Sequence, residues 1–516
     1  MHRQPWAAAL PTRVHNFGYG FLAIALPFII RLIPEAIAWP YPLGFDTLGY
    51  YIPAMRWWIN PFSGQSLPMD ILGLFKTAGL FYVLAVGFNR YLMPDPFIAV
   101  KLLGPVLIGF VSLSAYFYGR LSLRWDFRKA LFASLIATLY FVGLRISWEL
   151  YRNMLGVVFL FAALTALEVF IGVRRYLLVG AFTLLTFMSH QITSVILLGV
   201  LILRSLWLCT RGESGEAKVH FYLSAFAGVL LLYQLYSPQL GRPVIPVAIT
   251  GFHLSLEAST YVLGFLAYCF IFLLPLALLG LKMDRGIAIN SWTLVCLLLL
   301  VPVFIGGVAS VPLWFRWPLM LVYPLSFYFA DGFDKAMRFR CWRSPSGFMV
   351  KISAIGLVAL IALTSGYYLI SYPEHPFPYF SQYNPYLRYI QSSTLQNSIS
   401  IQDVPSLLRA IDASSSLLGD GAALVVHEAV YVWAVNRLGP EVRLVPVKEP
   451  GYLSVKPEST SKAIEQIALM NYYSGYRVYT IWWINGSGWY TMSRLPASFK
   501  LIESTGAFGV YLFNPS

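Results

Sequence analysis

Two carboxylates stand out because each lies in a short polar stretch between strongly apolar segments. Asp46 belongs to the run 44–51, directly after the first apolar segment, and Glu149 lies in the stretch 144–153 between two later ones. A carboxylate near a lipid bilayer is costly unless it faces water or a partner, so both residues are candidates for function. Two carboxylates from separate loops could hold a divalent cation such as Mg or Mn, or one could deprotonate an attacking hydroxyl while the other orients the acceptor.

Both carboxylates also have simpler interpretations. Asp46 suits the N-cap of a short amphipathic helix over residues 47–59, since Asp is a preferred residue at that position. The capping and functional roles are compatible, because a helix that begins there would hold the carboxylate at the membrane surface. Glu149 suits an ion pair with Arg145 or Arg152.

Four cationic or titratable residues are candidates for binding an anionic ligand. His190 interrupts a long apolar stretch; it predicts either a contact with phosphate or a sugar hydroxyl, or a polar turn between two short helices. Arg316 stands among aromatic residues near the end of a predicted span. An arginine there either snorkels to the interface or grips a phosphate with its planar fork. Arg152 and Lys76 are the next cationic candidates.

The composition indicates a membrane protein with enough polar sequence for one further domain. Of the 516 residues, 58% are hydrophobic and 12% charged, against about 25% charged in a soluble domain. The net charge of +14 is typical of cytoplasmic loops that face anionic headgroups, so we expect no nucleic-acid partner. The four cysteines give no zinc spacing and no disulfide framework, and residues 17–39 read as a retained first helix.

Eleven apolar segments are long enough to cross a bilayer. They lie at 17–39, 97–118, 130–146, 153–172, 175–190, 191–209, 219–236, 259–281, 288–308, 313–333 and 349–372. Basic clusters within 120–129, 174–175 and 335–343 then share one side, which the positive-inside rule makes cytoplasmic, together with the N-terminus. The clusters share one side only if residues 70–92 do not cross the membrane, which suits an interfacial or re-entrant helix. We expect a multi-pass protein of the plasma membrane.

The polar tail predicts a small extracytoplasmic domain. Helices are expected over 403–418, from 428 through 436 and over 459–473, and strands over 422–427, 442–447 and 478–484. Residues 500–513 look like a closing hairpin around Gly506. Alternating strands and helices predict a three-layer α/β domain. The expected domains are therefore 1–372, with a first outer loop at 40–96, and 373–516.

Together these features resemble the GT-C superfamily of membrane glycosyltransferases, which includes protein O-mannosyltransferases, aminoarabinose transferases and oligosaccharyltransferase catalytic subunits. The resemblance covers the overall plan: an early outer loop with an acid, many spans, juxtamembrane helices such as 70–92, and an outer C-terminal domain. Asp46 matches the catalytic aspartate of the family's first loop, Glu149 its second acid, and Arg316 its late arginine. Asp46 stands alone rather than in an Asp-Glu or Asp-X-Asp motif. The Trp-Trp-Asp-Tyr-Gly hallmark of oligosaccharyltransferases is absent, which favours transfer of a single sugar.

The resemblance implies a polytopic helical fold of about 11–12 transmembrane helices and a polyprenyl- or dolichyl-phosphate-linked sugar donor. It implies a protein or glycolipid acceptor in the cell envelope and inversion at the anomeric carbon. Asp46 would be the base or a metal ligand, Glu149 its partner, and Arg316, Arg152, His190 and Lys76 would bind the donor phosphate or sugar. A transporter or lipid flippase and a non-catalytic membrane scaffold are the alternatives, although no internal repeat typical of transporters is visible.

Overall fold

The computed structural model describes residues 13–515 apart from 59–69, 236–255, 284–285, 309–310, 312, 339–344, 376, 382, 448–456 and 485–493. The chain forms two compact units. The first contains 1–33, 68–84 and 102–366, and the second contains 34–67, 85–101 and 367–516. Each unit is described by itself.

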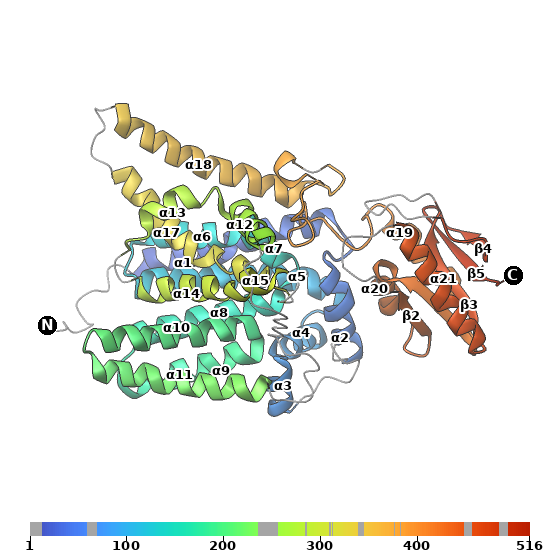
Figure 1. Cartoon of the computed structure of the whole chain (residues 1–516), viewed down its shortest axis with the longest axis horizontal. Helices are drawn as coiled ribbons and strands as arrows, with labels where there is room; N and C mark the ends of the chain where they lie inside the picture. Colours follow the sequence, from blue (N-terminus) through green and yellow to red (C-terminus); the bar gives the residue numbers. More distant parts are fainter. Residues whose placement is uncertain are drawn as a thin grey trace. The chain divides into compact units, whose positions relative to one another are not determined.

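The first unit is a bundle of apolar helices (Figure 1). Among the described residues, seven helices are long and apolar enough to cross a membrane, or up to ten if each bent pair is one span. The chain is thus mostly helical, as expected of a polytopic membrane protein. A π-helix η3 (Tyr118–Ser122) follows α5, and the ends of α1, α4, α5 and α18 belong to the second unit. The helices are α1 (Arg13–Ile37), α3 (Ile71–Thr77), α4 (Leu80–Tyr91), α5 (Pro96–Phe117), α6 (Phe127–Leu139), α7 (Phe141–Glu149), α8 (Tyr151–Val169), α9 (Gly172–Ser189), α10 (Gln191–Thr210), α11 (Ser214–Leu235), α12 (Leu256–Phe270), α13 (Leu274–Gly280), α14 (Ile287–Leu298), α15 (Val301–Gly306), α16 (Arg316–Leu319), α17 (Val322–Arg338) and α18 (Pro345–Ile370).

Every apolar segment expected to span is helical, but three apolar stretches are bent. The predicted spans 130–146 and 259–281 form the pairs α6–α7 and α12–α13, bent by 59° and 87°. The segment 70–92 forms α3 and α4, bent by 114°, so no straight helix covers it. The spans predicted at 175–190 and 313–333 correspond to α9 and to α16–α17, which are not among the seven.

Close helix crossings in the bundle depend on glycine. A Cβ atom on Gly280 of α13 would lie 1.9 Å from the carbonyl oxygen of Tyr328, and one on Gly332 of α17 would lie 1.8 Å from that of Leu276. The two backbones are therefore in direct contact at this crossing. Small residues permit such an approach between membrane helices, where dispersion forces and weak hydrogen bonds replace the hydrophobic effect as the source of association.

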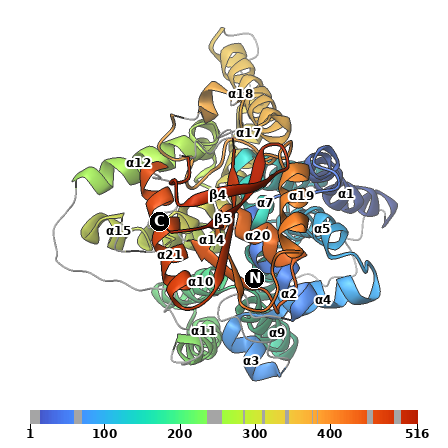
Figure 2. The same ribbon diagram turned by 90° about the vertical axis from the view of Figure 1, so that its right-hand side faces the viewer.

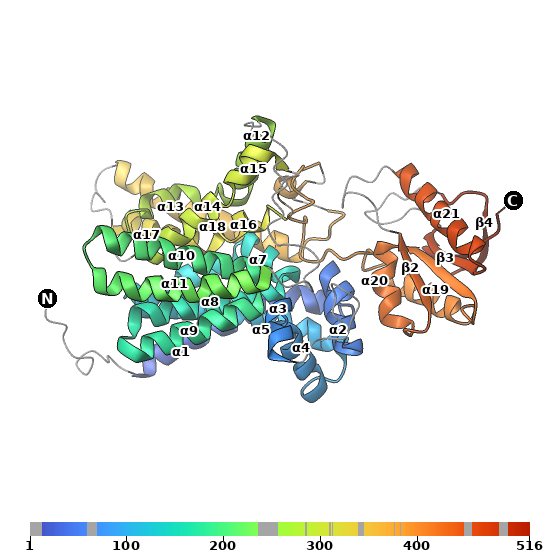
Figure 3. The same cartoon turned by 60° about the horizontal axis from the view of Figure 1, so that its bottom comes forward.

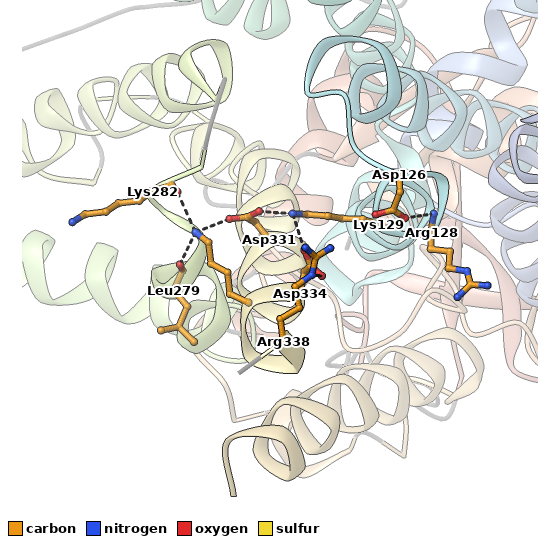
Figure 4. A network of polar contacts seen from close by, with 9 residues as sticks. Asp126, Arg128, Lys129, Leu279, Lys282, Asp331, Asp334 and Arg338 are labelled. Atoms are coloured by element: carbon orange, nitrogen blue, oxygen red, sulfur yellow. Dashed lines mark hydrogen bonds and ion pairs between the residues drawn. The ribbon is translucent and has the colours of Figure 1, made fainter. Parts of the chain in front are cut away.

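One end of the bundle is held by ion pairs between helix ends. Lys129, in the first turn of α6, contacts both Asp331 and Asp334 of α17, and Lys335 reaches Asp331 at 2.8 Å (Figure 4). Arg175 pairs with Glu216, and Arg204 pairs with Glu168. Described members of the three basic clusters thus lie at the same end of the helices, as the loop charges predict; residues 339–344 of the third lie outside the described part of the chain.

The tail domain, residues 373–516, is a five-stranded sheet with helices on both faces (Figure 3). Its elements are α19 (Val404–Ser415), β1 (Ala422–His427), α20 (Glu428–Arg437), β2 (Arg443–Val447), α21 (Pro457–Tyr473), β3 (Arg477–Trp483), β4 (Phe499–Ser504) and β5 (Phe508–Phe513). The strand order is β2-β1-β3-β5-β4, with β2, β1 and β3 parallel and β5 antiparallel to both neighbours. The predicted strands, helices and hairpin are confirmed to within two residues, except that α19 ends three residues early.

The two crossovers between parallel strands run in opposite directions across this sheet, which explains its three layers. It passes from β1 to β2 through α20 and returns past β1 to β3 through α21. Because parallel crossovers are right-handed, two crossovers in opposite directions place their helices on opposite faces. The hairpin of β4 and β5 closes the sheet (Figure 2), and Gly506 supplies the positive φ of 108° that its turn requires.

His427, at the end of β1, makes the stability of the tail domain depend on pH. Its Nδ1 accepts a hydrogen bond from the backbone of Ala429 at 3.1 Å, and burial lowers its pKa from 6.5 to about 4. The unfolded chain therefore binds more protons than the folded one between these values, so stability falls as the pH falls from 6.5 towards 4, by about 3 kcal/mol in total. His427→Asn keeps a capping side chain but does not titrate. Unfolding followed by tryptophan fluorescence from pH 7 to 4 should show a shallower slope in the variant, and an unchanged slope would contradict the assignment.

Candidate functional site

The amino ends of two parallel helices form the base of the candidate site in the first unit. Helices α8 and α10 run in the same direction because α9 joins them as an antiparallel neighbour (Figure 1). They pack tightly: a Cβ on Gly156 would lie 2.2 Å from the Oγ1 of Thr193. Helix amino ends carry free N–H groups and a partial positive charge, so two of them together favour an anion.

His190 is the N-cap of α10. Its Nδ1 accepts a hydrogen bond from the backbone of Ile192 at 3.2 Å, which places the hydrogen of a neutral ring on Nε2. Burial holds its pKa well below 6.5, and the positive charges of Arg152 and Arg316 lower it further. The ring is therefore a neutral hydrogen-bond donor, and the charges of two arginines predicted to belong to the site act on it. The predicted polar turn is confirmed, and the ligand contact stays a prediction.

Arg152 holds the bend between α3 and α4. It donates hydrogen bonds to the carbonyl oxygens of Thr77 and Ala78, both at 2.9 Å, and lies 5.3 Å from the centre of the Tyr82 ring. Ala78 has a φ of 47°, where the chain turns from one helix into the next. Arg152 thus stabilises the carboxyl end of α3 while its charge acts on the site.

Lys76 lies in the last turn of α3, 5.7 Å from the centre of the Tyr233 ring of α11. Buried Gln234 fixes this helix by donating to the carbonyl oxygens of Phe75 at 2.8 Å and Phe187 at 3.0 Å. The short helix α3 is therefore fastened to the ends of α9 and α11. Lys76 is next to the carbonyls that Arg152 binds, which gives this end of the bundle a further positive charge.

Arg316 and Asn153 each carry an N–H donor that has no hydrogen-bond partner among the described residues. Arg316 begins the short helix α16 and is half-buried, and its Nε finds no hydrogen-bond partner among the described residues. Asn153, in the first turn of α8, is 1% exposed, and in the described part of the chain its Nδ2 has none either. A buried donor is costly unless it meets an acceptor, so both point to an anionic or carbonyl ligand. The sequence signal for Asn153 was an amide at the start of the predicted span 153–172.

Glu149 is the last residue of α7 and pairs with Arg145 of the same helix at 3.4 Å. Both are buried, and Arg145 lies 5.2 Å from the centre of the Trp148 ring. The ion pair with Arg145 that the sequence offered is therefore present. Arg31 of α1, which the sequence did not single out as a site residue, is fully buried and donates to the Oγ of Ser147 on α7 at 3.1 Å.

Asp46 belongs to the second unit, where the predicted helix is confirmed in part and the predicted cap is corrected. The chain is helical over 45–57, with a π-helix η2 (Thr47–Tyr51) before α2 (Ile52–Trp57), and residue 59 lies outside the described part of the chain. Asp46 stands at the N-cap position, but its carboxylate makes no capping bond. The reason is its helical backbone, with φ −62° and ψ −29°, whereas a capping side chain needs an extended one to reach the free N–H groups.

A divalent cation stays a prediction. The described residues contain no group of three or more His, Cys, Asp or Glu that could hold a metal ion. Glu149 is engaged by Arg145, and Asp46 lies in the other compact unit. Within the first unit, the charges of Arg152 and Arg316 act on His190, and Lys76 directly precedes Thr77, whose carbonyl oxygen Arg152 binds.

The chain has no match among the known protein-family models, and no curated protein matches it in sequence. What it does must therefore be argued from its own residues.

Proposed function

We propose that the chain is a membrane glycosyltransferase that moves a sugar from a polyprenyl-phosphate donor to an acceptor on the extracytoplasmic face, with inversion. The observation that carries the proposal is buried His190 at the amino end of α10, beside the amino end of α8, where the charges of Arg152 and Arg316 both act on it. All three side chains can donate hydrogen bonds, and two of them carry a positive charge, which suits a phosphate. Apolar helices support the same ligand, because a polyprenyl chain would stay in the lipid that surrounds them.

This donor set would act on the leaving group. When the bond between the anomeric carbon and the phosphate oxygen breaks, its electron pair goes to the phosphate, and preorganised donors stabilise the charge that develops. Arg316 offers a planar fork, the neutral ring of His190 one N–H group, and Asn153 an amide. Lys76 and Arg152 would add to the positive potential.

The other half of the reaction is assigned to Asp46. The acceptor oxygen attacks the anomeric carbon from the face opposite the phosphate, which inverts the configuration, and its proton passes to the Asp46 carboxylate. If a metal is required, Asp46 and Glu149 are the proposed ligands, and Mg or Mn would polarise the acceptor hydroxyl. The acceptor is a protein or a glycolipid, and the tail domain and first loop face the same extracytoplasmic side.

The test is turnover by the purified full-length protein in proteoliposomes that contain polyprenyl-phosphate hexoses or pentoses. We expect release of polyprenyl phosphate with an added acceptor, and slow release when water is the acceptor. Nucleotide sugars should not replace the lipid donor, and sugar-free polyprenyl phosphate should inhibit. Movement of the intact donor between leaflets without cleavage would identify a transporter or flippase instead. If no donor is cleaved and none is moved, the non-catalytic membrane scaffold is the remaining interpretation.

A further inference from the structure

The stretch around Asp46 and the tail domain belong to the same compact unit although they are more than 300 residues apart in sequence. We call residues 45–52 the Asp46 turn. It contains the π-helix η2, which packs against α20 of the tail domain. A π-helix is rare and occurs frequently at functional sites, where it needs support from its surroundings.

The sequence of the Asp46 turn leaves one carbonyl group without a partner. In η2 the N–H of Ile52 bonds to the carbonyl oxygen of Thr47, five residues back. The carbonyl oxygen of Leu48 would next take the N–H of residue 53, but that residue is a proline and has none. Both the α-helical and the π-helical partners of the Leu48 carbonyl are therefore lost.

Asn436 of α20 supplies the missing donor. Its Nδ2 lies 2.7 Å from the carbonyl oxygen of Leu48 and 2.7 Å from that of Val432 in its own helix, and the side chain is 2% exposed. The backbone carbonyl of Asn436 in turn accepts a hydrogen bond from Arg56, in the last turn of α2. One residue of the tail domain thus binds both helices that follow Asp46.

Further contacts hold the chain on either side of the Asp46 turn. Asn397 donates to the carbonyl oxygen of Pro42, and the rings of Tyr41 and Trp433 meet edge to face with centres 6.0 Å apart. A Cβ on Gly49 would lie 3.2 Å from Val432 of α20, so the two elements fit with no spare room.

We infer that the tail domain positions the Asp46 turn and that Asn436 is the positioning residue. The domain is then part of the machinery that orients the Asp46 carboxylate rather than a separate module that only selects the acceptor. The contacts stand without the proposed function, but their catalytic meaning rests on it.

The experiment compares Asn436→Ala with Asn471→Ala in the full-length protein. Asn471 is a matched control: it is buried, and its Nδ2 donates to Ile467 four residues back in α21, while its Oδ1 accepts from Arg443 within the tail domain. Loss of the donor to a buried carbonyl should raise hydrogen exchange in peptides covering 45–52 about tenfold in the Asn436 variant. The same peptides should stay protected in the Asn471 variant.

Activity gives a second readout that a structural role alone would not move. In Asn436→Ala, kcat should fall at least tenfold while the KM for the lipid donor stays constant, because the phosphate-binding residues belong to the first unit. Gly49→Ala should behave similarly, and adding Val432→Ala should restore kcat by removing the contact. Unchanged exchange at 45–52 overturns the inference, as does an unchanged kcat in an active enzyme. A wild-type protein without turnover contradicts the proposed function alone, and the exchange comparison still decides the positioning role.

Discussion

Asp46→Asn should abolish sugar transfer, with kcat about 10²–10⁴-fold lower, while the protein remains folded. An amide cannot accept the acceptor's proton and is a weak ligand for a divalent cation, so the substitution removes either proposed role. It should cost little stability, because Asn has nearly the same size and shape as Asp. The measurement is release of polyprenyl phosphate under saturating donor and acceptor. Titration with Mn separates the roles, since added metal should partly restore the variant only if Asp46 is a ligand.

Asp95→Asn is the matched control for this substitution. Asp95 belongs to the predicted first loop and to the same compact unit as Asp46. Its Oδ1 accepts from the backbone of Phe97 at 2.8 Å and of Ile98 at 3.3 Å, at the start of α5. Asn is an equally good capping residue, so this variant should transfer sugar at the wild-type rate. Full activity in Asp46→Asn would refute the assignment of Asp46.

The helices and strands were predictable because their signals are local. Apolar runs of bilayer length give the helices of the bundle, and alternation of apolar residues with Gly and Pro between them gives the tail domain. The pairing of Lys129 and Lys335 with one carboxylate, Asp331, agrees with the prediction that their clusters share a side, because the rule for loop charge needs no tertiary contact. Which side of the membrane that is stays a prediction.

The predictions that failed depended on contacts distant in sequence. Asp46 has the residue type of a helix cap, but the π-helix that follows it is completed by Asn436, which is 388 residues from Leu48. No periodicity in the sequence indicates the pairing of Asn436 with Leu48. The unused donor of Asn153 likewise becomes visible only when α8 and α10 are packed. Propensity therefore predicted the elements, whereas tertiary contacts decided which polar groups remain for chemistry.

Arg316→Ala should lower kcat/KM for the lipid donor about 10²–10³-fold, the range seen when one preorganised donor to a developing oxyanion is removed. Arg316 is half-buried, its Nε has no partner among the described residues, and its charge acts on His190. A phosphate there would meet an Nε that no described residue binds, whereas Arg152 already donates to two carbonyl oxygens at the end of α3. Inhibition by sugar-free polyprenyl phosphate should weaken in parallel, because the same donors bind the product.

Two further variants separate phosphate recognition from general charge. Arg316→Lys keeps the positive charge but loses the planar fork, so its kcat/KM should lie between the wild-type and alanine values. Arg338→Gln removes a charge from an exposed side chain, 73% accessible and paired with Asp334 at the opposite end of the bundle, and should leave the donor KM unchanged. If Arg316→Ala retained the wild-type donor KM, kcat and product inhibition, the phosphate site would have to be sought elsewhere in the chain.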